Sequence, residues 1–356
     1  MAHLFEPLRL RDVEFRNRVM VSPMCQYSSI DGLANDWHLV HLGTRAVGGA
    51  SLVMVEATGV TPDARISPMD MGIWSDAHVE PFRRISRFIE ERGAVPGIQL
   101  AHAGRKASTS EPWKGGNPVS PSEGGWTPIY APSAIAFAEG WQTPKALTVP
   151  EIAEVVRCFA VAAQRAEAAG ARLIEIHAAH GYLLHTFLSP LSNQRTDEYG
   201  GAFENRTRAL REVLTAVRKV WPERWPISVR ISASDWHKDG WTIEDSIALA
   251  RMLKPLGADI MDCSSGGILP HIKIPVGPGY QTGFAQRIRR EAEIPTISVG
   301  MITDAAQADH IIRTGQADAV MLARQLLRDP YWPLHAARAL GHDIPWPQQY
   351  ERAKPR

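Results

Sequence analysis

Two patterns of hydrophobic and polar positions alternate along most of this chain. Short apolar runs rich in strand-forming residues are followed by longer stretches in which apolar residues recur every three or four positions, as in an amphipathic helix. The apolar runs cover residues 18–22, 51–56, 95–100, 172–176, 227–230, 259–263, 295–299 and 317–322. The helical stretches cover residues 37–47, 79–92, 149–169, 203–220, 242–256, 284–293 and 304–314, and short helices follow from Gln325 and Pro330. Strands that alternate with helices predict an α/β protein, and right-handed crossovers close eight such units most simply as a (β/α)8 TIM barrel.

Two segments lie outside this alternation. Residues 4–16 alternate apolar and charged positions around Arg11 and Asp12, which predicts a small N-terminal hairpin. Residues 101–145 are rich in Pro, Gly and Ser, and we interpret them as a lid inserted after the third strand. An open, doubly wound sheet is the alternative fold, but the regular order of the units favours the barrel. Since no linker interrupts the pattern, we expect residues 1–356 to form one domain.

Composition narrows the class of protein. The formal net charge is +1, so no basic surface for nucleic acid is expected. The chain has no apolar run of about 18 residues and no signal-peptide pattern near its start, which predicts a cytoplasmic protein without a membrane segment. The cysteines, Cys25, Cys158 and Cys263, are scattered and odd in number, and we expect reduced thiols.

Residues with functional chemistry gather where the predicted strands end. In a TIM barrel the carboxyl ends of all strands meet at the face that carries the active site. The candidates at these ends are Ser22, Pro23, Met24, Cys25, Ala57, Gln99, His177, His180, Arg230, Gly300, Met301, Ala323 and Arg324. Small residues with free backbone amides beside Arg324 are typical of a phosphate site. No Gly-x-Gly-x-x-Gly follows the first strand. A cofactor held by a phosphorylated tail is therefore predicted.

Six motifs resemble those of the old yellow enzymes, FMN-dependent ene-reductases, and most of all their bacterial thermophilic-like subclass. They are SPMCQY at residues 22–27, GIQLAHAGRK at 97–106, IEIHAAHGY at 174–182, LSPLSN at 188–193, RTDEYGG at 195–201 and SVGMIT at 298–303. Similarity runs in the same order from residue 4 to residue 352, so it covers essentially the whole chain. The resemblance implies a TIM barrel with tightly bound FMN, NADPH or NADH as the hydride donor, and an activated alkene as the acceptor.

The resemblance also implies roles for the substrate-site residues. His177 and His180 would donate hydrogen bonds to the carbonyl or nitro oxygen of the acceptor, where charge develops. Tyr182 would protonate the α-carbon of the acceptor, and Tyr27 would contact the substrate. Taken alone, the two histidines could instead be a metal pair, so a metal-dependent barrel hydrolase is one alternative. A non-catalytic flavin-binding protein is another.

Further roles concern the cofactor. By resemblance, Arg230 would lie beside N1 and the C2 oxygen of the flavin, Gln99 at its pyrimidine edge and Cys25 near N5 as a redox modulator, while Ala57 would allow close approach to the ring. A buried glutamine without a ligand would be costly, which favours this role for Gln99.

Three further features, a departure from the family pattern, two charged residues in the excursion and the C-terminal segment, carry expectations of their own. Ala323 stands where the family usually has glycine, so a backbone angle that only glycine adopts would be strained there. Arg105 and Lys106 are interpreted as solvated charges of the excursion, without a role. In the subclass, a tail like residues 342–356 crosses to a neighbouring subunit. Arg352 would then complete the partner's substrate site in a homodimer or a dimer of dimers.

Overall fold

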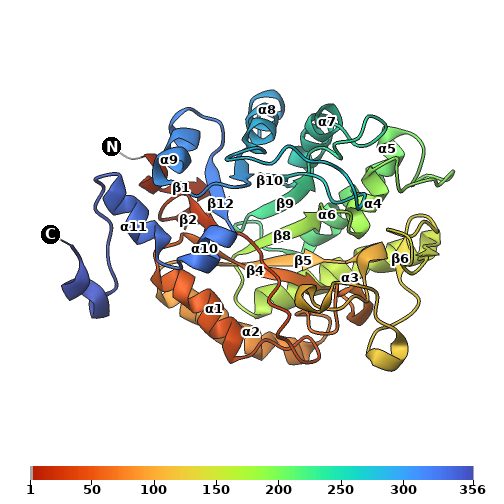
Figure 1. The fold of residues 1–356 in the computed structure, drawn as a ribbon, viewed down its shortest axis with the longest axis horizontal. Helices are drawn as coiled ribbons and strands as arrows, with labels where there is room; N and C mark the ends of the chain where they lie inside the picture. The colour runs from red at the N-terminus through yellow and green to blue at the C-terminus, as the bar shows by residue number, and fades with distance from the viewer. Residues whose placement is uncertain (1–2, 356) are drawn as a thin grey trace.

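The structure, a computed structural model that describes residues 3–355, contains a closed barrel of parallel strands (Figure 1). In barrel order the strands are β3 (Val19–Val21), β4 (Leu52–Gly59), β5 (Val95–Ala101), β8 (Leu173–Ala178), β9 (Ile227–Ser232), β10 (Ile260–Ser264), β11 (Thr296–Val299) and β12 (Ala319–Leu322). Pairing of β12 with β3 closes the ring. Both faces of these strands are buried, which explains why they read as continuous apolar runs in the sequence. The predicted TIM barrel is confirmed.

Helices surround the barrel at the predicted positions. They are α1 (Asp36–Val47), α2 (Val79–Glu91), α3 (Val149–Ala168), α6 (Arg208–Val220), α7 (Ile243–Leu253), α8 (Thr282–Ala292), α9 (Ala305–Arg313), α10 (Arg324–Arg328) and α11 (Trp332–Ala339). Short 3-10 helices are η1 (His3–Phe5), η2 (Pro62–Ala64), η3 (Asp76–His78) and η7 (Lys254–Leu256). The stretch predicted as one helix from residue 203 divides at Thr207 into α5 (Phe203–Arg206) and α6. Among residues 3–355, no helix combines the length and apolar character that a membrane crossing needs.

One helix, α4 (Leu183–Leu188), was not predicted. Its six residues are all buried, so it has no polar face and too few turns to show helical periodicity. It comes next after β8 in the chain and contacts this strand (Figure 1).

The hairpin and the excursion occupy their predicted places. The N-terminal hairpin pairs β1 (Leu8–Leu10) with β2 (Val13–Phe15) in antiparallel fashion. The backbone N–H of Asp12 donates to the Arg224 carbonyl just before β9, so the hairpin lies at the amino-terminal end of the barrel. The excursion leaves β5, contains η4 (Gly104–Lys106), η5 (Pro112–Lys114), η6 (Pro121–Glu123) and the parallel pair β6 (Tyr130–Ala131) and β7 (Lys145–Ala146), and returns before α3. Its role as a lid stays a prediction.

Candidate active site

The turn after β8 brings three predicted site residues together. His177 is near the end of β8, and His180 and Tyr182 follow in the turn. The ring centroids of His177 and His180 are 5.2 Å apart, and those of His177 and Tyr182 are 5.0 Å apart. Both pairs are nearly perpendicular. Three polar rings therefore share one side of the barrel mouth.

All three rings are held in their neutral forms. Burial, followed by the charge of Arg230, lowers the pKa of His177 and of His180 well below the ordinary value of histidine. Burial raises the pKa of the Tyr182 phenol well above its ordinary value. The Ala179 N–H donates to Nδ1 of His177 at 3.3 Å, so the proton of this neutral imidazole resides on Nε2. His177 thus has a free N–H donor, and Tyr182 keeps its proton at neutral pH.

Beneath these rings lies a buried polar floor formed by β5, β8, β9 and β10. Nη1 of Arg230 donates to Oγ of Ser22 at 3.1 Å, and Nε of Arg230 lies 3.3 Å from the Asp262 carboxylate. The Gln99 amide donates to Oε1 of Glu175 at 2.8 Å. Burial, followed by the Asp262 charge, raises the pKa of Glu175 to about 8. The argument that buried Gln99 needs a ligand was wrong, because its amide already has a partner in the protein.

The side of the mouth formed by β3 and β4 carries the other predicted ring contacts. Ala57 is buried beside Gln99, just after a register shift in β4. Burial, reinforced by Asp70, raises the pKa of the Cys25 thiol well above its ordinary value, so this thiol is neutral. The ring of Trp113, from the excursion, meets the Tyr27 ring edge-on at 5.6 Å. The sequence did not place Trp113, because long loops carry no periodic signal.

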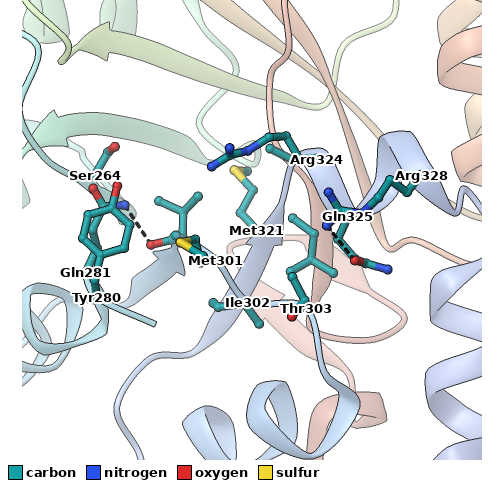
Figure 2. A pocket seen from close by; sticks show the side chains of 14 residues that line it. Ser264, Tyr280, Gln281, Met301, Ile302, Thr303, Met321, Arg324, Gln325 and Arg328 are labelled. Carbon is teal, nitrogen blue, oxygen red and sulfur yellow. Dashed lines mark hydrogen bonds between the residues drawn. The ribbon is translucent and has the colours of Figure 1, made fainter. Parts of the chain in front are cut away.

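A separate pocket of about 270 Å³ lies at the ends of β10, β11 and β12 (Figure 2). Its lining residues are Ser264, Tyr280, Gln281, Val299, Gly300, Met301, Ile302, Thr303, Met321, Leu322, Ala323, Arg324, Gln325 and Arg328. The lining includes two arginines and no carboxylate. In Figure 2 the Arg324 side chain extends over the pocket, and within residues 3–355 it has no hydrogen bond or ion pair with another side chain. This charge balance suits an anion, as predicted from the free amides and Arg324.

Glycine is required at one point of this pocket. Gly300 has a φ of +121°, and a Cβ there would lie 2.8 Å from Nε2 of Gln281. Gln281 is itself fixed, because its amide donates to the Val299 carbonyl at 2.9 Å and its oxygen accepts from Ser265 at 2.6 Å. Sequence reasoning missed Tyr280, Gln281 and Arg328 as pocket residues. Tyr280 and Gln281 precede α8, away from the strand ends.

The expectation of a glycine-only φ at Ala323 was wrong. Its φ is −106° and its ψ is −95°, which lies outside the helical and strand regions but on the negative-φ side that L-residues occupy. The neighbouring strand end differs, since Met301 has a φ of +51°.

The interpretation of Arg105 and Lys106 as solvated charges was also wrong. Arg105 is 1% exposed and donates to the Ile268 carbonyl at 2.5 Å. Nζ of Lys106 donates to the carbonyls of His180 and Gly267 at 2.8 and 2.7 Å. Burial, followed by the Arg105 charge, lowers the pKa of Lys106 to about 7. These two side chains fasten the excursion to the turn after β8 and to the loop after β10.

The C-terminal residues lie elsewhere. Arg352 is exposed on η8 (Gln348–Ala353), which Figure 1 shows beyond α11 on the outside of the barrel. Within one chain it is therefore not part of the site, and its role across an interface stays a prediction. Cys25, Cys158 and Cys263 are free, as expected. Among residues 3–355, no group of three or more His, Cys, Asp or Glu side chains is arranged to hold a metal ion.

The fold and this site together define a TIM-barrel oxidoreductase that uses a phosphorylated flavin. Neutral polar rings and a fixed guanidinium lie beside an anion pocket at one barrel mouth. FMN fits this arrangement, because Arg324 and the backbone of the pocket could hold its phosphate, and Arg230, Gln99 and Ala57 could face its ring.

The comparisons with known proteins agree. Residues 3–343 match the NADH:flavin oxidoreductase / NADH oxidase family. Over 351 residues the chain is 50% identical to NADPH dehydrogenase of Geobacillus sp. (strain WCH70), and 98% of each chain is covered. It is 48% identical to NADPH dehydrogenase of Bacillus subtilis (strain 168), again with 98% of each covered.

Solved structures extend the similarity. Morphinone reductase is 28% identical with a TM-score of 0.78, and the match covers 96% of this chain and 90% of that one. The old yellow enzyme homologue from Zymomonas mobilis is 25% identical with a TM-score of 0.77, and the match covers 96% and 94%. This chain belongs to the NADH:flavin oxidoreductase / NADH oxidase family and is an NADPH dehydrogenase of the old yellow enzyme type. The predicted family is confirmed, and the hydrolase alternative loses its support.

Proposed function

We propose that this NADPH dehydrogenase is an ene-reductase that reduces the activated C=C bond of enones, maleimides and nitroalkenes, and that nitro compounds also serve as acceptors. The observation that carries the proposal is the cluster of neutral donors formed by His177, His180 and Tyr182. Bound FMN would supply the redox chemistry, accepting hydride from NADPH or NADH and passing it to the β-carbon of the alkene. We propose further that the whole chain acts as one FMN-binding unit.

The histidines would bind the electron-withdrawing oxygen of the acceptor. Negative charge grows on this oxygen as the β-carbon receives hydride, and donors already aimed at it stabilise that charge. Desolvation keeps both imidazoles neutral near pH 7. Each can therefore donate a hydrogen bond to the acceptor without changing its protonation state. Each neutral ring offers one N–H, and that of His177 is on Nε2.

Tyr182 would complete the reaction as the proton donor to the α-carbon. A donor must keep its proton until the acceptor becomes basic, and the raised pKa of the buried phenol ensures this. Tyr27, whose ring packs against Trp113, would form the opposite wall of the substrate space.

Several residues would hold the cofactor. Arg324 and the backbone around Gly300, Met301 and Ala323 would hold the phosphate, since this pocket has two arginines and no carboxylate. Arg230 would favour negative charge at the pyrimidine edge of the ring, because a guanidinium stays protonated. Cys25 would present a neutral thiol near the reactive edge, in the company of Ser22, Pro23 and Met24.

The tail supports a shared site. Tyr350 packs on Tyr331, the residue before α11 of its own chain, with ring centroids 6.0 Å apart, and Arg352 is exposed. We propose that Arg352 reaches the substrate site of a neighbouring subunit in a homodimer or a dimer of dimers, where its planar guanidinium can meet a carbonyl.

The purified protein tests the function directly. It should be yellow and release FMN on acid denaturation, lose its colour with NADPH under anaerobic conditions, and regain it when an enone is added. A colourless protein with bound zinc would instead support the alternative function, a metal-dependent hydrolase. A flavin that NADPH does not reduce, or an enone does not reoxidise, would indicate a binding protein.

A further inference from the structure

The turn that presents the donor rings is strained and tightly constrained. His180 has a φ of +60°, a left-handed conformation that residues with a Cβ seldom adopt. Gly181 follows with a φ of +75°, and a Cβ on it would lie 2.2 Å from the Gly267 carbonyl oxygen. Such a conformation persists only where surrounding contacts enforce it. The contacts around this turn therefore decide where His180 and Tyr182 point.

One of these contacts comes from a buried histidine outside the substrate site. The N–H of Gly181 donates to Nδ1 of His185 at 2.8 Å. His185 lies on α4 and is fully buried. Gly181 stands between His180 and Tyr182, so this bond acts at the centre of the turn, whereas the Tyr182 N–H donates back to the Ala179 carbonyl at 3.2 Å. The bond from Gly181 requires Nδ1 to be unprotonated.

The far side of the same ring faces a buried carboxylate. Nε2 of His185 lies 3.0 Å from Oδ1 of Asp235, and both side chains are 0% exposed. The contact is a close charge contact whose geometry falls outside that of a hydrogen bond, and within residues 3–355 neither atom has a hydrogen-bond partner. Oδ2 of Asp235 is already occupied, because it accepts from Ser189 Oγ at 2.6 Å and from the Trp241 N–H at 2.7 Å. These two donors fix the carboxylate against the imidazole.

An adjacent carboxylate selects the tautomer of a histidine. With the proton of His185 on Nε2, facing Asp235, Nδ1 is free to accept from Gly181. We propose that His185 and Asp235 form a positioning pair, in which Asp235 fixes the tautomer of His185 and His185 holds the strained His180–Gly181 turn so that the rings of His177, His180 and Tyr182 converge. Neither residue touches the reacting atoms. The inference rests on the proposed roles of those three rings.

Other contacts to the turn do not replace this one. The N–H of His180 donates to Ser232 at 2.9 Å, the His180 carbonyl accepts from Lys106 at 2.8 Å, and Nε2 of His180 lies 2.7 Å from Oγ of Ser264. All three act on the first residue of the turn. The Gly181 N–H, buried at the bend, would otherwise be left without an acceptor, which is costly for a backbone donor.

Two substitutions of His185 separate its hydrogen bond from its volume. His185→Asn keeps an oxygen close to the place of Nδ1, whereas His185→Leu has nearly the same size without an acceptor. Leucine nearly fills the space of the ring and asparagine does not, so a loss of packing alone would make His185→Asn the more damaging change. The test uses the FMN-loaded enzyme, with flavin content and thermal midpoint measured for each variant.

The readouts are the dissociation constant of a para-substituted phenol, followed by its charge-transfer band with the flavin, and the rate of enone-driven reoxidation. We expect His185→Leu to weaken phenol binding and slow reoxidation by on the order of tenfold or more, because small misplacements of reacting groups have large effects. Reduction by NADPH should change less. His185→Asn should restore both values to within about threefold of the wild type, since the acceptor is what matters.

Asp235→Asn provides a second test that leaves the His185 ring in place. The amide oxygen would keep the donors Ser189 and Trp241, and its NH2 would then face Nε2 of His185. This arrangement moves the imidazole proton to Nδ1, against the Gly181 N–H, so phenol binding should weaken as in His185→Leu. The same logic makes an aspartate-to-asparagine change select the wrong histidine tautomer in the serine-protease triad.

The inference is overturned if His185→Asn and His185→Leu behave alike, or if Asp235→Asn binds the phenol as the wild type does. Failure of the underlying function looks different. In that case the wild-type enzyme itself would give no phenol band and no enone-driven reoxidation.

Discussion

The two halves of the barrel mouth are built on different principles. The half at the ends of β8 and β9 consists of buried and half-buried side chains whose pKa values are shifted by desolvation, such as His177, His180 and Tyr182. The half at the ends of β11 and β12 consists of backbone and exposed charge, with Gly300, Ala323 and Arg324 at its centre. The first half offers neutral donors and the second offers positive charge.

This difference assigns a separate task to each half. Neutral, desolvated donors suit a substrate that is neutral when it binds and gains charge only during reaction. Exposed arginines and amides suit a ligand whose charge is permanent, such as a phosphate. Substitutions in the first half should therefore change reaction with the acceptor, and substitutions in the second should change cofactor retention.

The largest effect is expected for Tyr182→Phe. This variant loses the proton donor but keeps the ring that packs near His177. Enone-driven reoxidation should slow by about 10²-fold or more, whereas reduction by NADPH should stay near the wild-type rate. Stopped-flow absorbance of the two half-reactions measures both. Several acceptors should be tried, and wild-type reoxidation with all of them would show that another group supplies the proton.

Next comes Arg324→Met in the anion half. Loss of a charged partner for a phosphate should weaken FMN binding about tenfold to a hundredfold, while the refilled enzyme reacts normally with enone. Fluorescence titration of the apoprotein with FMN measures the effect. Arg328→Met is the matched control, because the Arg328 guanidinium already donates to Gln325 at 3.0 Å, and its effect should be smaller. Equal FMN affinity in wild type and Arg324→Met would remove the arginine from the phosphate site.

The carboxyl of Glu175, in the buried polar floor between the two halves, should make the free energy of unfolding depend on pH. The pKa of Glu175 is raised to about 8, first by burial, so its carboxyl is protonated in the fold below this pH. The unfolded chain loses this proton near pH 4.5, so wild-type stability falls as pH rises from about 4.5 to 8. Glu175→Gln lacks this proton. Its stability relative to wild type should rise by up to about 1.4 kcal/mol per pH unit in that window, as measured by chemical unfolding at several pH values. A constant difference would contradict the assignment.

A smaller effect is expected from the tail. Truncation after Pro345 should raise the enone KM severalfold and change the mass in solution, because the shared arginine and its anchor are both removed. Arg352→Gln is the matched control, since it keeps the tail and should raise KM without changing the mass. An unchanged KM and mass after truncation would show that the tail takes no part in the site.

The smallest effect is expected for Ala323→Gly. With a φ of −106°, Ala323 does not adopt the positive φ at which glycine would be favoured. The variant should therefore lose roughly 0.5–1 kcal/mol through the greater freedom of the unfolded chain, and its FMN affinity should not change. Thermal unfolding measures this loss. A gain in stability would mean that the position does favour glycine.

The sequence predicted the barrel because each strand is buried on both faces and each outer helix on one, which produces clear periodic patterns. It also placed the strand-end residues, since all carboxyl ends of a barrel meet at one face. The sequence did not predict helix α4, because its residues are buried on every side and show no helical periodicity. His185, which lies on this helix, was therefore missed as well.

Buried charges were the other failure. Lysine and arginine are mostly exposed in proteins, so Arg105 and Lys106 were taken for surface residues. Their partners are backbone carbonyls of His180, Gly267 and Ile268, which lie far away in the sequence. Gln99 was misjudged for the same reason, because Glu175 on the next strand satisfies its amide. Contacts of this kind depend on tertiary structure and leave no local pattern.

The division of tasks between the two halves can be tested in one measurement: the dissociation constants of FMN and of a para-substituted phenol, determined for both His177→Ala and Arg324→Met. We predict that His177→Ala weakens the phenol by on the order of 10²-fold and leaves FMN bound as in the wild type. Arg324→Met should weaken FMN and leave the phenol affinity of the refilled enzyme unchanged. If each variant weakens both ligands to a similar extent, the two halves do not act separately and this account is wrong.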